Sequence, residues 1–523
     1  MRRFASALLF SALGSAPLLA APPPPPPPAP PPLAPPPLSA LYPHAVTTVH
    51  SVRADGRTLH YNATAGTILL RDRKGAPTAR MFYIAYTERG VRHPSRRPLT
   101  FAYNGGPGFA SALVDIGGFG PRRIVWPAPG NTRAYAPPYR LVPNPATLLP
   151  ATDLVFVDAV GTGYSRIVGA GQPSMFYGVN ADGRAFAQFV IRYLTKTGRW
   201  NSPKFLLGES YGTTRSAVLG NDLVDDGVYL NGIVLCSTVL NFPTINFAPG
   251  NELPYELYLP SYAAVAWYHH RLHPRPKNLA LFVRRVEAFA EGPYARALFA
   301  GDTLPRAAAR RLAAVLARDT GIAARTWLKA HLRLTLPVFM RLVLGGRERQ
   351  TGRFDARFSL PILQPMLGVP GGSDQGATTS AIWGALTSTF VTYVRRSLRY
   401  RTDLLYRQNS NRVFHAWKWS YLPPLHETDE DVGTMADVNV APALARAMVN
   451  DPALHLLSEN GYFDLATPFF ATVYTLHHLR LPPALRRHVV IQYNASGHML
   501  YLNPSALPRL GRRIDAFITE ASR

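Results

Sequence analysis

The residues of this chain that are best suited to carry out a reaction are Gly208-Glu209-Ser210-Tyr211-Gly212. A short apolar run, Lys204 to Leu207, precedes them and is typical of a buried strand, and Thr213 to Val224 has the length and spacing of a helix. A Gly-x-Ser-x-Gly segment at such a junction predicts a nucleophile elbow, a tight turn that lifts the Ser hydroxyl clear of the sheet. The helix N-terminus would favour negative charge developing there. The alternative is an ordinary strand-to-helix turn, but the flanking elements favour Ser210 as a nucleophile.

A Ser hydroxyl is a poor nucleophile near neutral pH, so it needs a His base that is itself oriented by a carboxylate. In proteins with such an elbow, these partners follow in the order acid, then His. Asp464 fits the acid, within Glu459-Asn-Gly-Tyr-Phe-Asp-Leu-Ala-Thr-Pro468, and His498 fits the base, within Ser496-Gly-His-Met499. Two alternatives stay open: Asp464 could cap a helix that begins near Pro468, and His498 could be one surface His among fifteen.

Attack on a carbonyl carbon also needs hydrogen-bond donors for the oxyanion. The amide of Tyr211, directly after the nucleophile, is one such donor. The second is expected from a glycine-rich loop after an early strand, and Asn104-Gly-Gly-Pro-Gly108 follows the expected strand Leu99 to Tyr103. We therefore predict that Gly105-Gly106 supplies the second donor, although these five residues could also form a simple tight turn.

Apolar strands alternate with helices along much of the chain, which predicts an α/β fold with a mostly parallel central sheet and helices on both faces. Helical periodicity dominates residues 241–438, which we expect to form an inserted helical cap. The core would then comprise residues 44–240 and 439–523. The expected elements include strands at Thr58–Asn62, Thr67–Arg71, Met81–Thr87, Leu154–Val157, Leu454–Ser458 and Val489–Tyr493, and helices at Ala181–Thr195, Tyr262–His270, Leu279–Phe299, Pro305–Arg318, Ser380–Leu405 and Pro504–Glu520.

The composition is that of a globular protein, because 47% of the 523 residues are hydrophobic and 17% are charged. The net charge of +25 invites a nucleic-acid or membrane-surface hypothesis, but the basic residues form no stripe or block and no helix-turn-helix or finger spacing is present. We therefore predict no nucleic-acid partner. The single cysteine, Cys236, lies in an apolar run and is expected to be a buried strand residue. No metal-binding spacing of His residues is present, and neither a metal nor a cofactor is predicted.

The N-terminus predicts a secretory signal peptide at residues 1–20, since two arginines precede a mostly apolar stretch that ends in small residues. A membrane anchor is the competing interpretation, but Gly14, Ser15 and Pro17 leave too short an apolar core. Residues 21–43 are rich in proline and predict an extended polyproline II linker. We expect an exported protein without stable membrane insertion. Export without disulfides suggests a bacterial periplasm or exterior.

Several of these motifs, taken in order, make the chain similar to the serine carboxypeptidase family from about Leu99 to the C-terminus, with the cap least alike. The motifs are Asn104-Gly-Gly-Pro-Gly108, Gly161-Thr-Gly-Tyr-Ser165, Gly208-Glu-Ser-Tyr-Gly212, Asn460-Gly-x-x-Asp464 and Gly497-His-Met499. The resemblance implies an α/β-hydrolase fold with a catalytic triad of Ser210, Asp464 and His498. It also implies an oxyanion hole formed by the amides of Gly106 and Tyr211.

The same resemblance implies that Asn104 and Glu209 bind the terminal carboxylate of a peptide substrate. Glu209 would do so in its protonated state, because burial beside the nucleophile should raise its pKa. The chain departs from the family at two places. Tyr103 stands where the well-studied eukaryotic members carry Trp, and Gly118 stands where they carry a second glutamate. The carboxylate clamp is therefore incomplete, and we hypothesise that Arg122 or Arg123 supplies charge instead.

Together these features predict an exported serine-type carboxypeptidase that hydrolyses the C-terminal bonds of peptides through an acyl-enzyme. An esterase or acyltransferase that uses the same triad is the alternative. A non-catalytic binding protein built on a hydrolase fold is a third interpretation, which the complete triad disfavours. No feature of the sequence indicates an oligomeric state.

Overall fold

The structure is a computed structural model that describes residues 42, 44–128, 136–346, 349–361, 376–423, 434 and 437–523. The predicted signal peptide at residues 1–20 lies outside these residues, as does the predicted linker at residues 21–43 apart from Tyr42. Within the described ranges, every helix is too short or too polar to cross a lipid bilayer.

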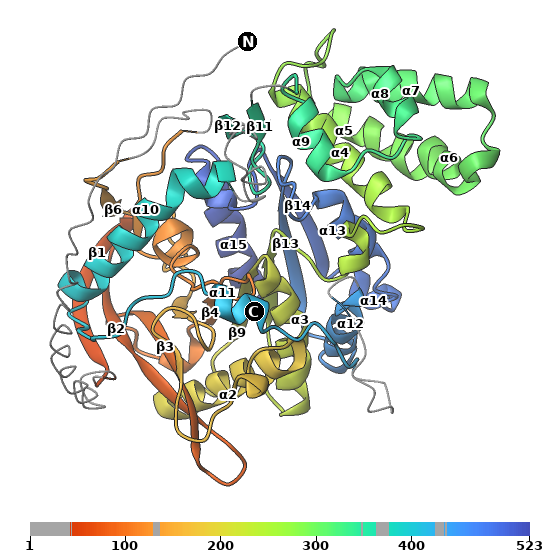
Figure 1. The fold of residues 1–523 in the computed structure, drawn as a ribbon. Helices are drawn as coiled ribbons and strands as arrows, with labels where there is room; N and C mark the ends of the chain where they lie inside the picture. The colour runs from red at the N-terminus through yellow and green to blue at the C-terminus, as the bar shows by residue number, and fades with distance from the viewer. Residues whose placement is uncertain are drawn as a thin grey trace, which may run out of the picture.

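A mixed sheet forms the centre of the molecule (Figure 1). The strands β7, β4, β9, β10, β13 and β14 pair in parallel, while β1, β2 and β3 form an antiparallel edge that joins at β7 and also pairs with the short β8. In sheet order the bounds are β1 Val46–Ala54, β2 Arg57–Arg71, β3 Pro77–Glu88, β7 Asp153–Val157, β4 Leu99–Tyr103, β9 Lys204–Glu209, β10 Gly232–Cys236, β13 His455–Gly461 and β14 Val489–Asn494, with β8 at Arg166–Ile167. Outside this sheet, β5 (Arg122–Ile124) pairs with β6 (Leu141–Pro143).

Two hydrophobic cores cover the two faces of this sheet, because successive side chains of a strand point to opposite faces. In β9, Leu206 belongs to one core and Leu207 to the other. The first core is closed by α2 (Val179–Thr197), α3 (Tyr211–Asp225) and α12 (Ala441–Asn450), and the second by α15 (Leu507–Ala521). Cys236 is 1% exposed within the second core, as predicted. This arrangement confirms the predicted α/β-hydrolase fold class, with helices on both faces of the sheet.

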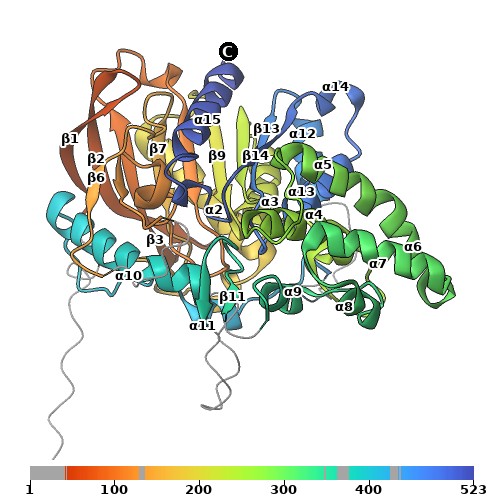
Figure 2. The ribbon, with the colours of Figure 1, turned by 90° about the horizontal axis from the view of Figure 1, so that it is seen from above.

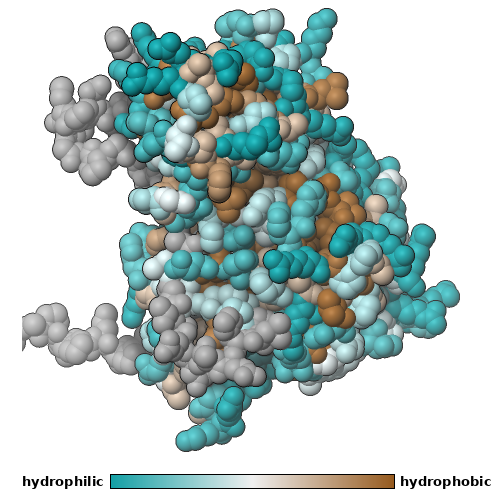
Figure 3. Space-filling view, turned by 90° about the vertical axis from the view of Figure 1, so that its right-hand side faces the viewer, coloured by the Kyte–Doolittle hydropathy of each residue, from teal (hydrophilic) through white to brown (hydrophobic). Residues whose placement is uncertain are grey.

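The helices that follow β10 form a lobe at one side of the sheet, drawn in green in Figure 1. They are α4 (Leu253–Tyr268), α5 (Leu279–Phe289), α6 (Ala295–Ala300), α7 (Arg306–Thr320), α8 (Ala324–Lys329) and α9 (Leu336–Leu342). Together with α13 (Phe469–His477) they bury a third core. Two apolar side chains of the lobe, Leu281 and Phe299, are 63% and 93% exposed. The side of the molecule seen in Figure 3 shows apolar patches among hydrophilic residues.

The second part of the predicted cap does not join this lobe. The hairpin of β11 (Arg349–Thr351) and β12 (Ser359–Pro361) leads to α10 (Gly376–Thr392), which lies across the sheet from the lobe (Figure 2). Apolar residues of α10, among them Leu386 and Phe390, belong to the core that α15 covers. After α10 the chain passes through α11 (Asn411–His415), and α14 (Pro483–Arg486) comes near the end of the chain.

Some expected elements differ in extent. The two short strands expected between Thr58 and Arg71 form one 15-residue strand, β2, which twists alongside β1 and β3. The expected helix at Leu279–Phe299 is interrupted, because a wider turn with Pro293 at residues 290–294 separates α5 from α6. The helix expected at Ser380–Leu405 begins at Gly376 and ends its regular part at Thr392.

Candidate functional site

A cavity of about 490 Å³ opens at the carboxyl ends of the parallel strands, the end of an open α/β sheet at which ligands bind. Ser210 and His498 both line it, although they come from opposite parts of the chain. The other predicted site residues that line it are Asn104, Gly106, Glu209 and Tyr211. Asp464 lies behind His498 and is completely buried.

Ser210 stands between β9 and α3 with φ 61° and ψ −130°. Positive φ is rare for a residue with a Cβ atom and costs free energy, so the surrounding contacts must impose it. The Ser210 amide donates to the Cys236 carbonyl at 3.0 Å, and the Ser210 carbonyl accepts from the Thr213 amide at 2.8 Å. The turn is therefore tied to β10 on one side and to the first turn of α3 on the other, which presents the side chain to the cavity.

The carboxylate of Asp464 is held by the backbone and side chains of its own loop. Its Oδ1 accepts from the amides of Ala466 and Thr467 at 2.7 and 3.0 Å. Its Oδ2 accepts from the Thr467 hydroxyl at 2.6 Å and lies 2.8 Å from His498 Nδ1. The N-cap of α13 is Pro468, so Asp464 does not take the helix-capping role that the sequence left open.

His498 is 2% exposed, which rules out the alternative of a surface His. Burial lowers its pKa, but the charge of Asp464 and the hydrogen bond to it outweigh burial and raise the pKa above the ordinary value. The backbone is also fixed, since the His498 amide donates to the Phe354 carbonyl and the His498 carbonyl accepts from the Ser237 hydroxyl, both at 2.6 Å. The arrangement suits an imidazole that must gain a proton and return it.

The two predicted oxyanion donors come from loops in close contact. Gly105 lies so near the start of α3 that a Cβ atom there would be 2.4 Å from the Gly212 nitrogen and 2.5 Å from the Tyr211 nitrogen. Only glycine fits this approach. The glycine-rich loop is therefore pressed against the elbow, and Gly106 and Tyr211 line the same cavity as Ser210.

Asn104 and Glu209 form a buried pair beside Ser210. Asn104 Nδ2 donates to Glu209 Oε1 at 2.8 Å, and Asn104 Oδ1 accepts from the Val114 amide at 3.0 Å. Burial raises the pKa of Glu209 to about 7, against the lowering effects of His498, Tyr501 and Asn104. Glu209 is thus a carboxyl group that carries a proton for much of the time near neutral pH.

Tyr501 accounts for the glycine at position 118. A Cβ atom on Gly118 would lie 2.6 Å from the Tyr501 ring, so this ring occupies the space that a glutamate side chain would need. The Tyr501 hydroxyl lies near Glu209 and Asn104, and it lowers the pKa of Glu209. It stops short of hydrogen-bond geometry, because neither this hydroxyl nor Glu209 Oε2 has a hydrogen-bond partner among the described residues.

Arg215 makes buried contacts with residues around the site. It is buried, pairs with Asp182 at 2.6 Å and donates to the Asn104 carbonyl at 2.6 Å. Its guanidinium lies 5.5 Å from the centre of the Tyr211 ring. A buried, paired cation of this kind fixes the positions of the loops around it.

Sequence reasoning missed Thr467, Tyr501, Arg215 and a further lining residue, Arg353. It also named Arg122 or Arg123 as the cation that binds a substrate carboxylate. Arg122 and Arg123 lie in β5 and do not line the cavity, so the hypothesis that one of them meets a substrate carboxylate is not supported. Among the described residues, no three His, Cys, Asp or Glu side chains gather as they would around a metal ion.

The model of the serine carboxypeptidase family matches residues 63–240, about a third of the chain. This range holds the glycine-rich loop and the elbow but ends before Asp464 and His498. None of the curated proteins compared with the chain matches it.

Solved structures extend the likeness to most of the chain. Kex1(Δ)p, a prohormone-processing carboxypeptidase from Saccharomyces cerevisiae, superimposes with a TM-score of 0.55 at 15% identity and covers 88% of this chain and 92% of its own. A proline iminopeptidase from Mycobacterium smegmatis has a TM-score of 0.36 at 14% identity and covers 88% and 98%. The likeness to the yeast carboxypeptidase shows an α/β-hydrolase fold, and the first core segment of the chain matches the serine carboxypeptidase family.

Proposed function

We propose that the protein is a serine-type carboxypeptidase that removes residues from the C-termini of peptides. One observation carries this proposal: the cavity that Ser210 and the Asp464-bound His498 line also contains Glu209, a buried carboxyl group whose pKa is about 7. A protonated carboxyl group beside the nucleophile is a donor for a substrate carboxylate. The family match over residues 63–240 and the fold shared with a yeast carboxypeptidase support the same activity.

In the proposed mechanism the Ser210 hydroxyl attacks the carbonyl carbon of the last peptide bond while His498 takes its proton. The amides of Gly106 and Tyr211 donate to the oxyanion that forms. His498 then gives its proton to the leaving nitrogen, and an acyl-enzyme remains on Ser210. A water molecule, deprotonated by His498, releases the acyl group by the same steps in reverse.

Asp464 keeps the imidazole in the required tautomer and orientation and stabilises the imidazolium that forms. The close packing of Gly105 against the elbow fixes the two oxyanion donors before substrate arrives, so no reorganisation is needed during attack. Asn104 holds Glu209 in place through its side-chain amide.

The first experiment is digestion of a defined peptide mixture, read by mass spectrometry. Stepwise loss from the C-terminus is the expected result, and internal cleavage alone would contradict exopeptidase action. A fluorophosphonate probe should label the wild-type protein. Ser210→Ala should abolish both the labelling and the hydrolysis while leaving the thermal unfolding transition in place.

An esterase or acyltransferase is the second candidate, because the same groups act on any activated acyl carbon. The apolar character of much of the lining, with Phe242, Trp383, Phe414 and Trp419, is compatible with an ester's acyl chain. Rates for a peptide acid, its C-terminal amide and a matched simple ester separate the candidates. A preference for the ester with no turnover of the peptide acid would favour the second.

We also propose that the protein is exported by a bacterium, to the periplasm or beyond, on the basis of the sequence of residues 1–20. Expression of the full chain in a bacterial host, with fractionation and N-terminal sequencing, tests this. The expected mature protein lacks about the first 20 residues. An uncleaved chain in the cytoplasm would contradict the proposal.

A further inference from the structure

The cavity holds a permanent positive charge that the mechanism above does not use. Among the described residues that line it, Arg353 is the one arginine or lysine, and it is partly buried. We propose that Arg353 binds the α-carboxylate of the leaving residue and so selects substrates that end next to the scissile bond. This inference rests on the proposed peptidase function and names the residue that recognises the substrate carboxylate.

The backbone of Arg353 is tied to both catalytic loops. Its carbonyl accepts from the Leu465 amide at 3.0 Å, next to Asp464. The carbonyl of the following residue, Phe354, accepts from the His498 amide at 2.6 Å. The segment that carries Arg353 therefore bridges the loops of the acid and the base, and its position relative to them is fixed by hydrogen bonds.

The same segment is rigid on its other side. The Phe354 ring lies 5.0 Å from the His498 ring, centre to centre. Asp355 is buried and pairs with Arg357 at 2.6 Å, and the Ala356 amide donates to the Phe463 carbonyl at 3.0 Å. A substrate-reading side chain needs such a support, because loose placement by about 1 Å weakens recognition.

The reaction places a carboxylate on this side of the cavity. His498 protonates the leaving nitrogen, and in an exopeptidase the α-carboxylate of the leaving residue is attached to the carbon next to that nitrogen. Arg353 is close enough to His498 for its charge to act on the imidazole. A long guanidinium side chain here reaches the carboxylate and meets both of its oxygens in a planar, two-bond geometry.

This assignment also fits what Gly118 and Tyr501 do. The Tyr501 ring fills the space above Gly118, so a second carboxyl group cannot enter there. Glu209 remains as a donor in its protonated state, while the guanidinium of Arg353 offers only donors. The chain would thus recognise a carboxylate with one acid and one cation.

The test compares a peptide with a free C-terminus and the same peptide with a C-terminal amide, in wild type, Arg353→Met and Arg353→Lys. For Arg353→Met we expect kcat/KM on the free acid to fall about 10- to 100-fold, as for loss of a charged hydrogen bond, and kcat/KM on the amide to change less than about twofold. Arg353→Lys should lie between, because it keeps the charge but not the fork. Arg349→Met is the matched control, since Arg349 lies in the same hairpin and its side chain contacts Ser359 outside the cavity.

Two outcomes overturn the proposal: a parallel fall for acid and amide in Arg353→Met, or no change for either. Fluorophosphonate labelling of Ser210 in every variant shows whether the nucleophile is intact. A wild-type protein that is neither labelled nor active on any acyl substrate would instead overturn the proposed function. A protein that is labelled and hydrolyses peptides, but shows no loss of acid preference in Arg353→Met, would leave that function standing and remove the role of Arg353 alone.

Discussion

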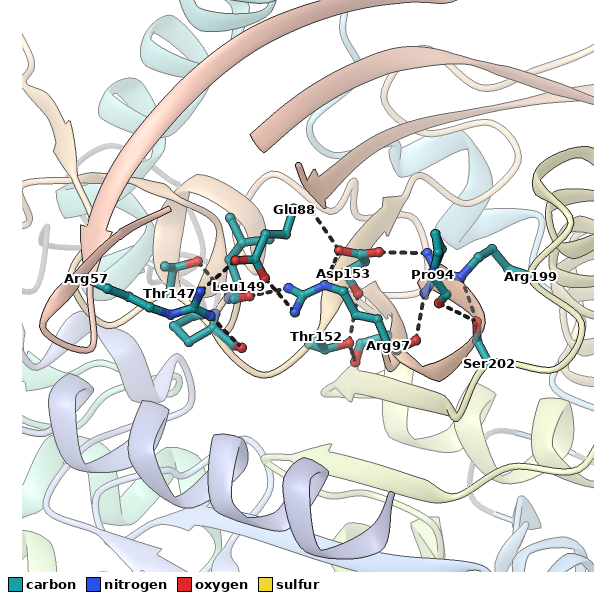
Figure 4. A network of polar contacts seen from close by, with 12 residues as sticks. Arg57, Glu88, Pro94, Arg97, Thr147, Leu149, Thr152, Asp153, Arg199 and Ser202 are labelled. Atoms are coloured by element: carbon teal, nitrogen blue, oxygen red, sulfur yellow. Dashed lines mark hydrogen bonds and ion pairs between the residues drawn. The ribbon is translucent and has the colours of Figure 1, made fainter. Parts of the chain in front are cut away.

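The two ends of the central sheet differ in how the charged side chains near them are paired. At the amino ends of β4, β7 and β9, carboxylates and guanidinium groups form a continuous network (Figure 4). Both oxygens of Asp153 are paired, Oδ1 with Arg97 and Oδ2 with Arg199, each at 2.7 Å. Glu88 pairs with Arg57 at 2.7 Å and with Arg97 at 2.8 Å.

At the carboxyl ends, buried ion pairs such as Arg215 with Asp182 surround the cavity, but two groups that line it, Glu209 and Ser210, are less favourably placed. Glu209 is buried without a cation in contact, which raises its pKa to about 7, and its Oε2 has no hydrogen-bond partner among the described residues. Ser210 is held at a positive φ that costs free energy. The charged groups at the amino end thus stabilise the fold, whereas the proposed site at the carboxyl end contains a strained residue and a carboxyl group that is costly to bury. Changes at the two ends should therefore separate activity from stability.

The largest expected effect is that of Asp464→Asn, which keeps the shape of the side chain but leaves His498 in the wrong tautomer. We expect kcat to fall by about 10⁴-fold, because a correctly held imidazole is needed in both proton transfers. Steady-state kinetics with a peptide acid measure the loss, and fluorophosphonate labelling should slow in parallel. A variant with full activity would remove Asp464 from the triad.

At the amino end, Asp153→Asn should lower the stability of the protein and leave its activity nearly unchanged. It removes the anion from the buried guanidinium group of Arg199, while Arg97 keeps Glu88, and we expect a loss of about 3–5 kcal/mol in the free energy of unfolding. Urea denaturation measures this loss. At temperatures at which the variant stays folded, kcat should remain within about twofold of wild type. A large fall in kcat with normal stability would break the division between the two ends.

The motifs of the sequence could bring Ser210, Asp464 and His498 to one edge of the sheet because each lies just beyond the end of a strand, and parallel strands bring their carboxyl ends together. They could not locate Arg353 or Tyr501. Arg353 follows the three-residue strand β11, which is too short to show a periodicity within a stretch dominated by helices. Tyr501 acts through Gly118, some 380 residues earlier, and only the packed fold reveals that contact.

The division of the predicted cap has a similar cause. Periodicity predicts helices within residues 241–438, but it shows only that one face of a helix is apolar. It does not show whether that face meets α13, as in the lobe, or the second core beside α15, as for α10. The partner of an apolar face is a property of the whole fold.

At the carboxyl end, Glu209→Gln should change the pH dependence of kcat/KM. With a pKa of about 7, Glu209 donates to a carboxylate below that pH and loses the proton above it, so wild-type activity on a peptide acid should decline above pH 7. Gln is neutral and a donor at every pH, so the ratio of variant to wild type should rise about tenfold from pH 6 to pH 8.

The same substitution also affects His498. Ionised Glu209 raises the His498 pKa, and its removal should therefore shift the acid limb of the profile to lower pH. A peptide amide is the control, because it has no carboxylate and should show no Glu209-dependent decline. If the alkaline limb for the peptide acid were the same in Glu209→Gln and wild type, Glu209 would not be the donor.

The smallest expected effect tests where the network at the amino end stops contributing. The Arg57 side chain is 51% exposed and contacts Glu88, which keeps its second partner, Arg97, when Arg57 is removed. Exposed ion pairs are screened by water, so Arg57→Met should lower the free energy of unfolding by no more than about 0.5 kcal/mol. The urea midpoints of Arg57→Met and Asp153→Asn, measured side by side, give the comparison. A loss for Arg57→Met as large as that for Asp153→Asn would mean that the network acts as one unit out to its exposed edge.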